Sequence, residues 1–220
     1  MRGSELRGAD GPGEGRAFTN SIVFVSDRTG AQQVYTMRSD GSHVRQLTTV
    51  VGNKDNPVFS PNGRRIAFAM SDTTGPIPQW IYVVNADGSG LTQLTTGFED
   101  DLMPSWSPNG SQIAFVSSRA HNAYRGIFVM NADGGDVHAV VADSVNNDSP
   151  SWSPNSNEIL FSRGFVGHGV FEITSGGDSI AFRVRGTQPE WSPSGTQFFS
   201  IAGSTCVFRV RVMRLWSTRS

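Results

Sequence analysis

The apolar positions of this chain fall in short runs separated by turn signals, and no window has helical periodicity. One such run is Arg65-Ile66-Ala67-Phe68-Ala69, and a similar one at residues 21–25 opens the patterned part of the chain. Runs this short, rich in β-branched and aromatic residues, predict strands that are buried on both faces. Further copies lie at residues 112–116, 158–162 and 197–201.

A second set of apolar runs follows four of the first runs and leads into a hairpin signal. Its copies lie at residues 34–37, 81–84, 127–130 and 170–173. Each continues into Asp-Gly or Gly-Gly, for example Asp87-Gly88, and then into another short apolar run such as residues 91–94. These dipeptides between apolar runs are strong signals of a tight β-hairpin.

The motif Pro-x-aromatic-Ser-Pro precedes four of the buried runs and sets the period of the chain. It occurs at residues 57–61, 104–108, 150–154 and 189–193, and the serines directly before its second proline are 47, 46 and 39 residues apart. The proline after the serine presets φ for a turn, and the Asn or Gly that follows tolerates the left-handed conformation that closes it. The motif therefore predicts a strand that ends in a tight reversal.

Four antiparallel strands in each period of about 40–47 residues are typical of a β-propeller blade. We therefore expect an all-β fold, a β-propeller of four-stranded antiparallel blades with about 4.5 to 5 blades. Residues 1–20 are expected to be a disordered leader, and the repeat units to span about 21–56, 57–103, 104–149, 150–188 and 189–220.

The expected strands number 18, which is not a multiple of four, so the ring is expected to be incomplete. The first unit lacks its innermost strand and the last unit lacks its outermost strand. A fragment of a six- or seven-bladed ring and an imperfect five-bladed ring both fit this count.

One aromatic residue recurs at a fixed place in each repeat, and we expect it to fill the seam between neighbouring blades. A blade cannot bury its own faces, so a large side chain at one position per blade packs against the next unit. A platform on which a ligand stacks is the alternative. The residues concerned are Phe59, Trp106, Trp152 and Trp191.

Composition and charge exclude several classes of protein and of partner. The net charge of −1 does not fit a general nucleic-acid binder. No apolar stretch approaches the roughly 20 residues of a membrane span. The single cysteine, Cys206, allows no intramolecular disulfide. The first 16 residues contain five glycines and no apolar run, which does not fit a secretory signal peptide.

No nucleophile elbow, phosphate-binding loop or zinc motif occurs, so we expect no catalytic residues and no enzyme. Acidic side chains do gather in the loops that enter the first strand at three of the four motifs, where they would meet at one mouth of the central channel, whereas the fourth motif has Thr187 and Gln188 there. Such carboxylates would form a docking ring for a basic segment or a Ca²⁺ site, and simple loop capping is the alternative. They are Asp55, Glu99, Asp100, Asp101 and Asp148. Otherwise no cofactor and no metal is expected.

These motifs together resemble the TolB-type WD-like propeller repeat. The closest stretches are residues 104–119 and 81–95, and the resemblance covers residues 21 to about 212. It implies a bacterial protein of the periplasm that binds another protein, in TolB a peptidoglycan-associated lipoprotein. Similar repeats form the gating propellers of prolyl-oligopeptidase-like peptidases and occur in pectate-fragment lyases.

Three functions therefore compete at this stage. The first is a non-catalytic protein-interaction scaffold, and the second is the accessory or gating propeller of a peptidase or glycan lyase whose catalytic part lies elsewhere. The third is a degenerate repeat fragment without independent activity. An unlatched first or last blade leaves strand edges open, which predicts self-association.

Overall fold

The computed structural model describes residues 21–71, 78–119, 124–164, 169–202 and 206–211, with side chains up to Ile201. These residues form 18 strands in five antiparallel sheets. The prediction of an all-β propeller with an incomplete ring is confirmed, and within the described ranges the strand count is the expected one. No bilayer-spanning helix is found in the described ranges.

The first and last sheets have three strands each. The first sheet has the order β1-β2-β3, and the fifth has the order β16-β17-β18. Their strands are β1 (Ser21–Ser26), β2 (Gln33–Arg38), β3 (Arg45–Gln46), β16 (Thr187–Trp191), β17 (Gln197–Ala202) and β18 (Cys206–Arg211).

The three middle sheets are complete four-stranded blades in which neighbours in sequence are neighbours in space. The second sheet contains β4 (Lys54–Phe59), β5 (Arg65–Met70), β6 (Trp80–Asn85) and β7 (Thr92–Gln93). The third contains β8 (Asp101–Trp106), β9 (Gln112–Ser117), β10 (Gly126–Asn131) and β11 (His138–Val141). The fourth contains β12 (Asn147–Trp152), β13 (Glu158–Arg163), β14 (Gly169–Thr174) and β15 (Ile180–Arg185).

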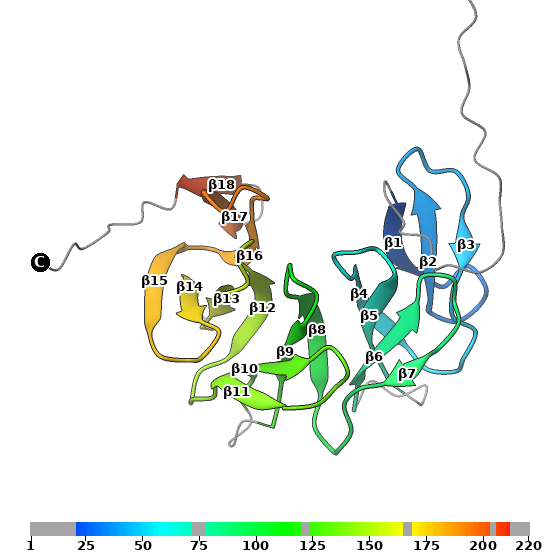
Figure 1. The fold of residues 1–220 in the computed structure, drawn as a ribbon, viewed down its shortest axis with the longest axis horizontal. Helices are drawn as coiled ribbons and strands as arrows, with labels where there is room; N and C mark the ends of the chain where they lie inside the picture. The colour runs from blue at the N-terminus through cyan, green and yellow to red at the C-terminus, as the bar shows by residue number, and fades with distance from the viewer. Residues whose placement is uncertain (1–20, 72–77, 120–123, 165–168, 203–205, 212–220) are drawn as a thin grey trace, which may run out of the picture.

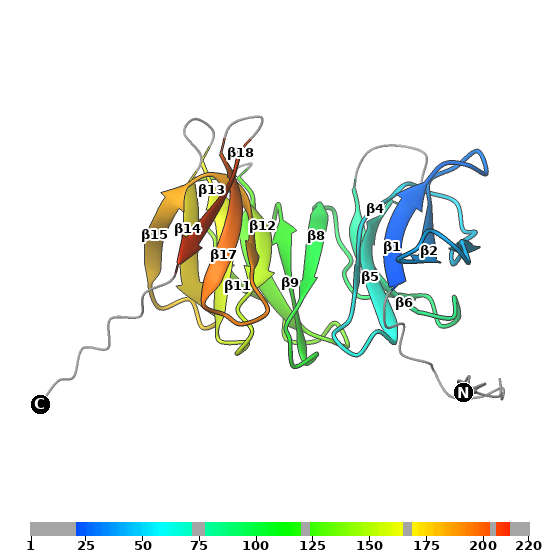
Figure 2. The same cartoon turned by 90° about the horizontal axis from the view of Figure 1, so that it is seen from above.

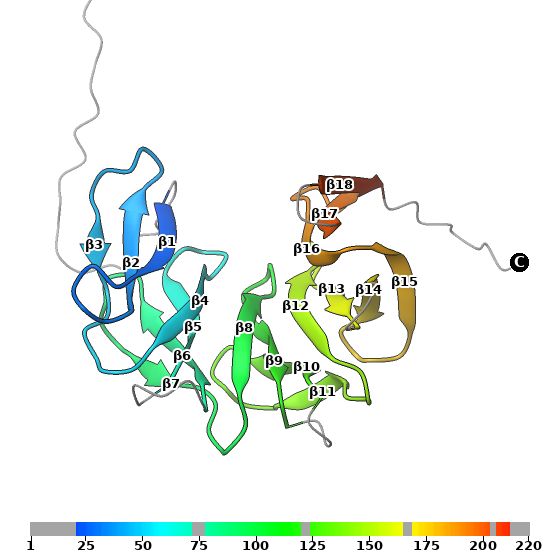
Figure 3. The ribbon, with the colours of Figure 1, turned by 180° about the vertical axis from the view of Figure 1, so that it is seen from behind.

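The five sheets stand side by side around an open arc (Figure 1). Strands β4, β8, β12 and β16 lie on the inside of the arc, and we call them the inner strands (Figures 1 and 3). The view from above shows the first sheet on one side of the molecule and the fourth and fifth sheets together on the other (Figure 2). The ring is therefore open between β1 and the fifth sheet.

The Ser-Pro turns close each inner hairpin by the same hydrogen bond. The serine carbonyl oxygen accepts from the backbone N–H three residues later, as Ser107 does from Gly110 at 2.7 Å. Gly110 has a φ of 72°, a left-handed conformation that glycine adopts without strain. Ser156 occupies the same place with a φ of 61° although it has a side chain.

The recurring aromatics lie in the seams between sheets. Trp106 is buried among Ala67 and Ile81 of the second sheet and Phe115 of its own sheet. Trp152 packs in the same way against the third sheet, and Trp191 against the fourth. Phe59 packs against the cluster that joins the first and second sheets. Each aromatic thus joins its own blade to the preceding one, which is how blades that cannot bury their own faces stabilise each other.

Candidate functional site

Every inner strand contains a β-bulge at its repeat proline. In β4 the pairing moves from Asp55–Ala69 to Val58–Ala67, so three steps on β4 match two on β5. The residue before the proline has a left-handed backbone in all four strands, although none is glycine, and proline normally favours an extended residue before it. The φ angles are 50° at Asn56, 51° at Met103, 54° at Ser149 and 50° at Gln188.

The bulge determines which side chains face the inside of the arc. Residues three apart on a regular strand point to opposite faces, but Asp55 and Val58 pair with Ala69 and Ala67, which share one face. The bulge therefore places the residue after the proline on the same face as the residue two positions before the proline. We call this residue the inner position, and its four members are Val58, Ser105, Ser151 and Glu190.

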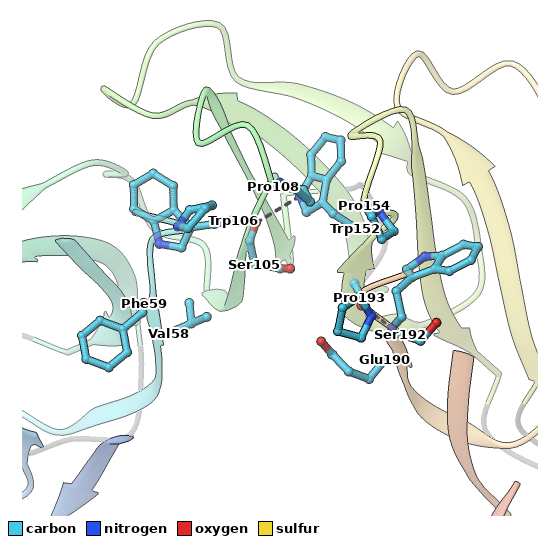
Figure 4. A pocket seen from close by; sticks show the side chains of 13 residues that line it. Val58, Phe59, Ser105, Trp106, Pro108, Trp152, Pro154, Glu190, Ser192 and Pro193 are labelled. Atoms are coloured by element: carbon cyan, nitrogen blue, oxygen red, sulfur yellow. Dashed lines mark hydrogen bonds between the residues drawn. The ribbon is translucent and has the colours of Figure 1, made fainter. Parts of the chain in front are cut away.

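A pocket of about 380 Å³ lies where the inner strands end (Figure 4). The four inner positions line it together with the four recurring aromatics, so each of the four inner strands contributes to its wall. The remaining lining residues are Ser192 and the turn prolines Pro61, Pro108, Pro154 and Pro193. We call it the inner pocket. Its walls are mostly apolar, aromatic and proline side chains, as in pockets that bind ligands or peptide segments.

Contacts between neighbouring sheets hold the inner positions in place. The indole nitrogen Nε1 of Trp152 donates to the backbone oxygen of Ser105 at 3.1 Å. The backbone N–H of Trp191 donates to Ser151 Oγ at 3.3 Å. Each contact joins one inner position to the aromatic residue of the next sheet, so the pocket wall and the seams form one structure.

Glu190 supplies the only carboxylate among the residues that line the inner pocket. Figure 4 shows its side chain directed into the pocket. Glu190 is exposed at the pocket wall. Partial desolvation there raises the pKa of its carboxyl above the ordinary value of 4.5, and a hydrogen bond with Ser151 acts in the opposite direction. An apolar pocket with one carboxylate fits an apolar segment that carries a basic group.

The acidic residues expected at the channel mouth lie at the opposite ends of the inner strands. Asp55 is exposed and accepts from the backbone N–H of Asn56 at 2.8 Å. Asp148 accepts from the hydroxyl of Ser149 at 3.0 Å. Asp55 is the second residue of β4, whereas the pocket-lining Phe59 is the last.

The other acidic loop residues also make local hydrogen bonds. Asp100 accepts from the backbone N–H of Gln79 at 3.1 Å, and Glu99 accepts from that of Phe98 at 3.1 Å. These are the contacts of loop caps. Within the described ranges no three His, Cys, Asp or Glu side chains lie close enough together to hold a metal ion.

The placement of Asp101 corrects the sequence prediction. Its side chain is 0% exposed and pairs with Arg119 at 2.5 Å, so it cannot face a channel mouth. Burial raises the pKa of the Asp101 carboxyl, while Ser117, Thr95 and Arg119 lower it. Asp55 and Asp148 also lie within strands, as the second residues of β4 and β12, but Asp101 is the first residue of β8, and the first residue of each of these three strands is buried.

Sequence reasoning missed a row of buried polar residues at the starts of three inner strands. Lys54, Asp101 and Asn147 occupy equivalent positions and are almost fully buried. Lys54 Nζ donates to the backbone oxygens of Val50 and, at 2.7 Å, Gly52.

The third member of the row, Asn147, is bound in a similar way. Its Nδ2 donates to the backbone oxygen of Val145 at 2.7 Å, and its Oδ1 accepts from Arg163 at 3.2 Å. The recurring Ser-Arg at the end of the second strand, seen at Ser118-Arg119 just after β9 and at Ser162-Arg163 within β13, is the signal that could have revealed this arrangement.

A family model described as the TolB beta propeller domain matches residues 48–199. The chain belongs to the TolB β-propeller domain family. A stretch of 54 residues is 46% identical to the Tol-Pal system protein TolB of Geobacter metallireducens, covering 24% of this chain and 13% of that protein.

Two solved structures show the same fold. The putative TolB from Agrobacterium tumefaciens superposes with a TM-score of 0.71 at 20% identity, covering 88% of this chain and 72% of that one. An oligogalacturonate lyase in complex with manganese superposes with a TM-score of 0.67 at 12% identity, covering 86% of this chain and 58% of that one. At these identities the likeness concerns the fold alone.

Proposed function

We propose that this chain is a non-catalytic protein-interaction scaffold that binds a segment of a partner protein in the inner pocket. The observation that carries the proposal is the composition of the pocket. Four inner strands bring equivalent apolar and aromatic positions to one place, and Glu190 adds a single carboxylate. The bound segment is therefore apolar and carries one basic group that pairs with Glu190.

The family supplies the class of partner. The matched relative is a protein of the Tol-Pal system, so the partner proposed for this chain is a peptidoglycan-associated lipoprotein in a bacterial periplasm. Loops and strand ends held by a rigid scaffold are common binding surfaces, because the scaffold tolerates variation in them at little cost.

The proposal is tested by isothermal titration of the purified chain with the soluble domain of a peptidoglycan-associated lipoprotein. Saturable binding at one site per chain is the expected result. An absence of binding at the highest attainable concentrations would contradict the scaffold with this partner, and would favour the alternative of an accessory propeller of a peptidase or glycan lyase.

A further inference from the structure

Two of the Ser-Pro turns contain asparagine followed directly by glycine. They are Asn62-Gly63 and Asn109-Gly110, and the sequence contains no other Asn-Gly pair. The third turn has Asn155-Ser156 at the same place. All three asparagines are exposed. Asparagine is a thermolabile residue. A following glycine makes it most reactive, because glycine leaves the backbone nitrogen unhindered and the chain free to bring that nitrogen to the side chain.

The reaction that such a pair undergoes joins Gly63 to the side chain of Asn62. The backbone nitrogen of Gly63 bonds to Asn62 Cγ, the Cγ–Nδ2 bond breaks, and ammonia leaves with the proton that the Gly63 nitrogen loses. Water then opens the resulting cyclic succinimide at one of its two carbonyl carbons and leaves either aspartate or isoaspartate. Isoaspartate lengthens the main chain of the turn by one carbon atom, directly after Pro61, which lines the inner pocket.

The attacking nitrogen is held in the same way in all three turns. Gly63 N–H donates to the backbone oxygen of Ser60 at 2.8 Å, and Gly110 N–H donates to that of Ser107 at 2.7 Å. Ser156 N–H makes the equivalent hydrogen bond at 2.8 Å. These bonds hinder the attack to a similar degree, so they do not distinguish one turn from another.

The asparagine side chains, in contrast, are held with different strength. Asn62 Oδ1 accepts from Ser60 Oγ at 2.8 Å and from the backbone N–H of Arg64 at 3.0 Å. Both bonds must break when the amide turns toward the Gly63 nitrogen.

Asn109 makes two further hydrogen bonds. Its Oδ1 accepts from Ser107 Oγ at 2.8 Å and from the backbone N–H of Ser111 at 3.0 Å, as in the first turn, but also from Ser111 Oγ at 2.7 Å. The backbone N–H of Asn109 donates to Ser156 Oγ at 3.2 Å, which ties this turn to the turn of the fourth sheet. Asn109 is therefore held more firmly than Asn62.

We propose that Asn62 is a site of spontaneous deamidation in the folded protein and that it reacts ahead of Asn109 and Asn155. Asn155 Oδ1 has the same two kinds of contact as Asn62, from Ser153 Oγ at 2.6 Å and from the backbone N–H of Asn157 at 3.1 Å. Serine follows Asn155, however, and its side chain hinders the attacking nitrogen. The change is covalent and needs no partner, so the proposal stands apart from the function of the inner pocket.

The test is incubation of the full chain at mildly alkaline pH in water labelled with heavy oxygen, followed by peptide mapping with mass spectrometry. Opening of the succinimide incorporates the label, and enzymatic methylation of isoaspartate identifies the second product. In the folded chain Asn62 is expected to react at least about five-fold faster than Asn109, the effect of one net hydrogen bond. In urea the two sites should react at similar rates, because neither side chain is then held.

Two variants separate the hold on the side chain from the identity of the next residue. Gly63→Ser copies Ser156, which has a side chain at a φ of 61° in the same kind of turn, and should lower the rate at Asn62 to that of Asn155. Ser111→Ala combined with Ser156→Ala removes both further contacts of Asn109 and should raise its rate toward that of Asn62. An unchanged β-sheet circular dichroism spectrum shows that each variant is folded.

The comparison of Asn62 with Asn109 within the parent chain needs no variant, so the proposal stays testable even if a substitution unfolds the protein. An Asn62 that stays unmodified in the folded chain but reacts in urea would overturn the proposal. So would an Asn109 that reacts as fast as Asn62 in the folded chain, or a folded Gly63→Ser chain that reacts like the parent.

Discussion

Trp152 Nε1 lies 3.1 Å from the backbone oxygen of Ser105, and this hydrogen bond crosses the seam between the third and fourth sheets. The equivalent Trp106 Nε1 is buried without a hydrogen-bond partner among the described residues. The two tryptophans therefore occupy similar seams, but Trp106 lacks this hydrogen bond and instead has the guanidinium of Arg65 over its ring, 4.8 Å from the ring centroid.

We predict that Trp152→Phe destabilises the fold more than Trp106→Phe, by about 1 kcal/mol in the free energy of unfolding. Both changes remove a similar volume, but only the first leaves a carbonyl oxygen without its donor. Urea denaturation of the two variants measures the difference. Equal losses would mean that the Trp152 hydrogen bond contributes nothing net.

Asp101→Asn and Asp101→Ala are predicted to behave very differently. Alanine leaves Arg119 without its carboxylate partner and is expected to lower the free energy of unfolding by about 3 kcal/mol. Asparagine copies the natural Asn147, which occupies the same place and accepts from Arg163. Asp101→Asn is therefore expected to change the free energy of unfolding only slightly. Urea denaturation of these two Asp101 variants measures the difference.

The pH dependence of the asparagine variant follows from the raised pKa of Asp101. The folded state keeps the proton at pH values where the unfolded chain has lost it, so this carboxyl contributes less stability as the pH rises from about its ordinary 3.8. The stability of Asp101→Asn should therefore increase relative to that of the parent chain as the pH rises above about 3.8. Parallel stability curves would contradict the burial of a titrating carboxyl.

Lys54 is predicted to destabilise the fold below pH 8. Burial lowers its pKa from 10.5 to about 8, so the folded state loses a proton that the unfolded chain keeps. Stability should then rise between pH 8 and pH 10.5, by at most about 3 kcal/mol. Denaturation of the parent chain and Lys54→Met at several pH values tests this, because the variant should lack that rise.

Binding in the inner pocket is predicted to weaken in mild acid. A basic group needs Glu190 in its charged form, and the raised pKa of this carboxyl means that protonation begins at a higher pH than for an ordinary glutamate. Titrations of the lipoprotein at pH 7.5 and pH 5 should show weaker binding at the lower pH. The difference should be absent in Glu190→Gln.

The architecture could be predicted from the sequence because each blade repeats its turn chemistry and its buried runs. The residues at which the inner strands begin could not be predicted. Proline suggests a strand that begins at the motif, since it cannot donate a ladder hydrogen bond. The structure extends β4 back to Lys54 and accommodates Pro57 at a bulge, beside a left-handed Asn56. Nothing in the residue types signals that conformation.

The inner pocket was also hidden from sequence reasoning. Its inner positions, Val58, Ser105, Ser151 and Glu190, have no chemistry in common, so only the bulge and the seams show that they meet. The acidic residues at the other ends of the strands gave a clear sequence signal but make local hydrogen bonds. Position along the chain showed neither their partners nor that Asp55, Asp101 and Asp148 belong to the inner strands themselves.

A matched pair of charge reversals tests most directly whether the inner pocket is the binding surface. Glu190→Lys changes the pocket, and Glu99→Lys changes the acidic loops at the opposite ends of the inner strands. Titration with the soluble lipoprotein domain should show at least about ten-fold weaker binding for Glu190→Lys and parent-like binding for Glu99→Lys. Binding that is lost in Glu99→Lys and retained in Glu190→Lys would contradict the account and move the binding surface to the acidic loops.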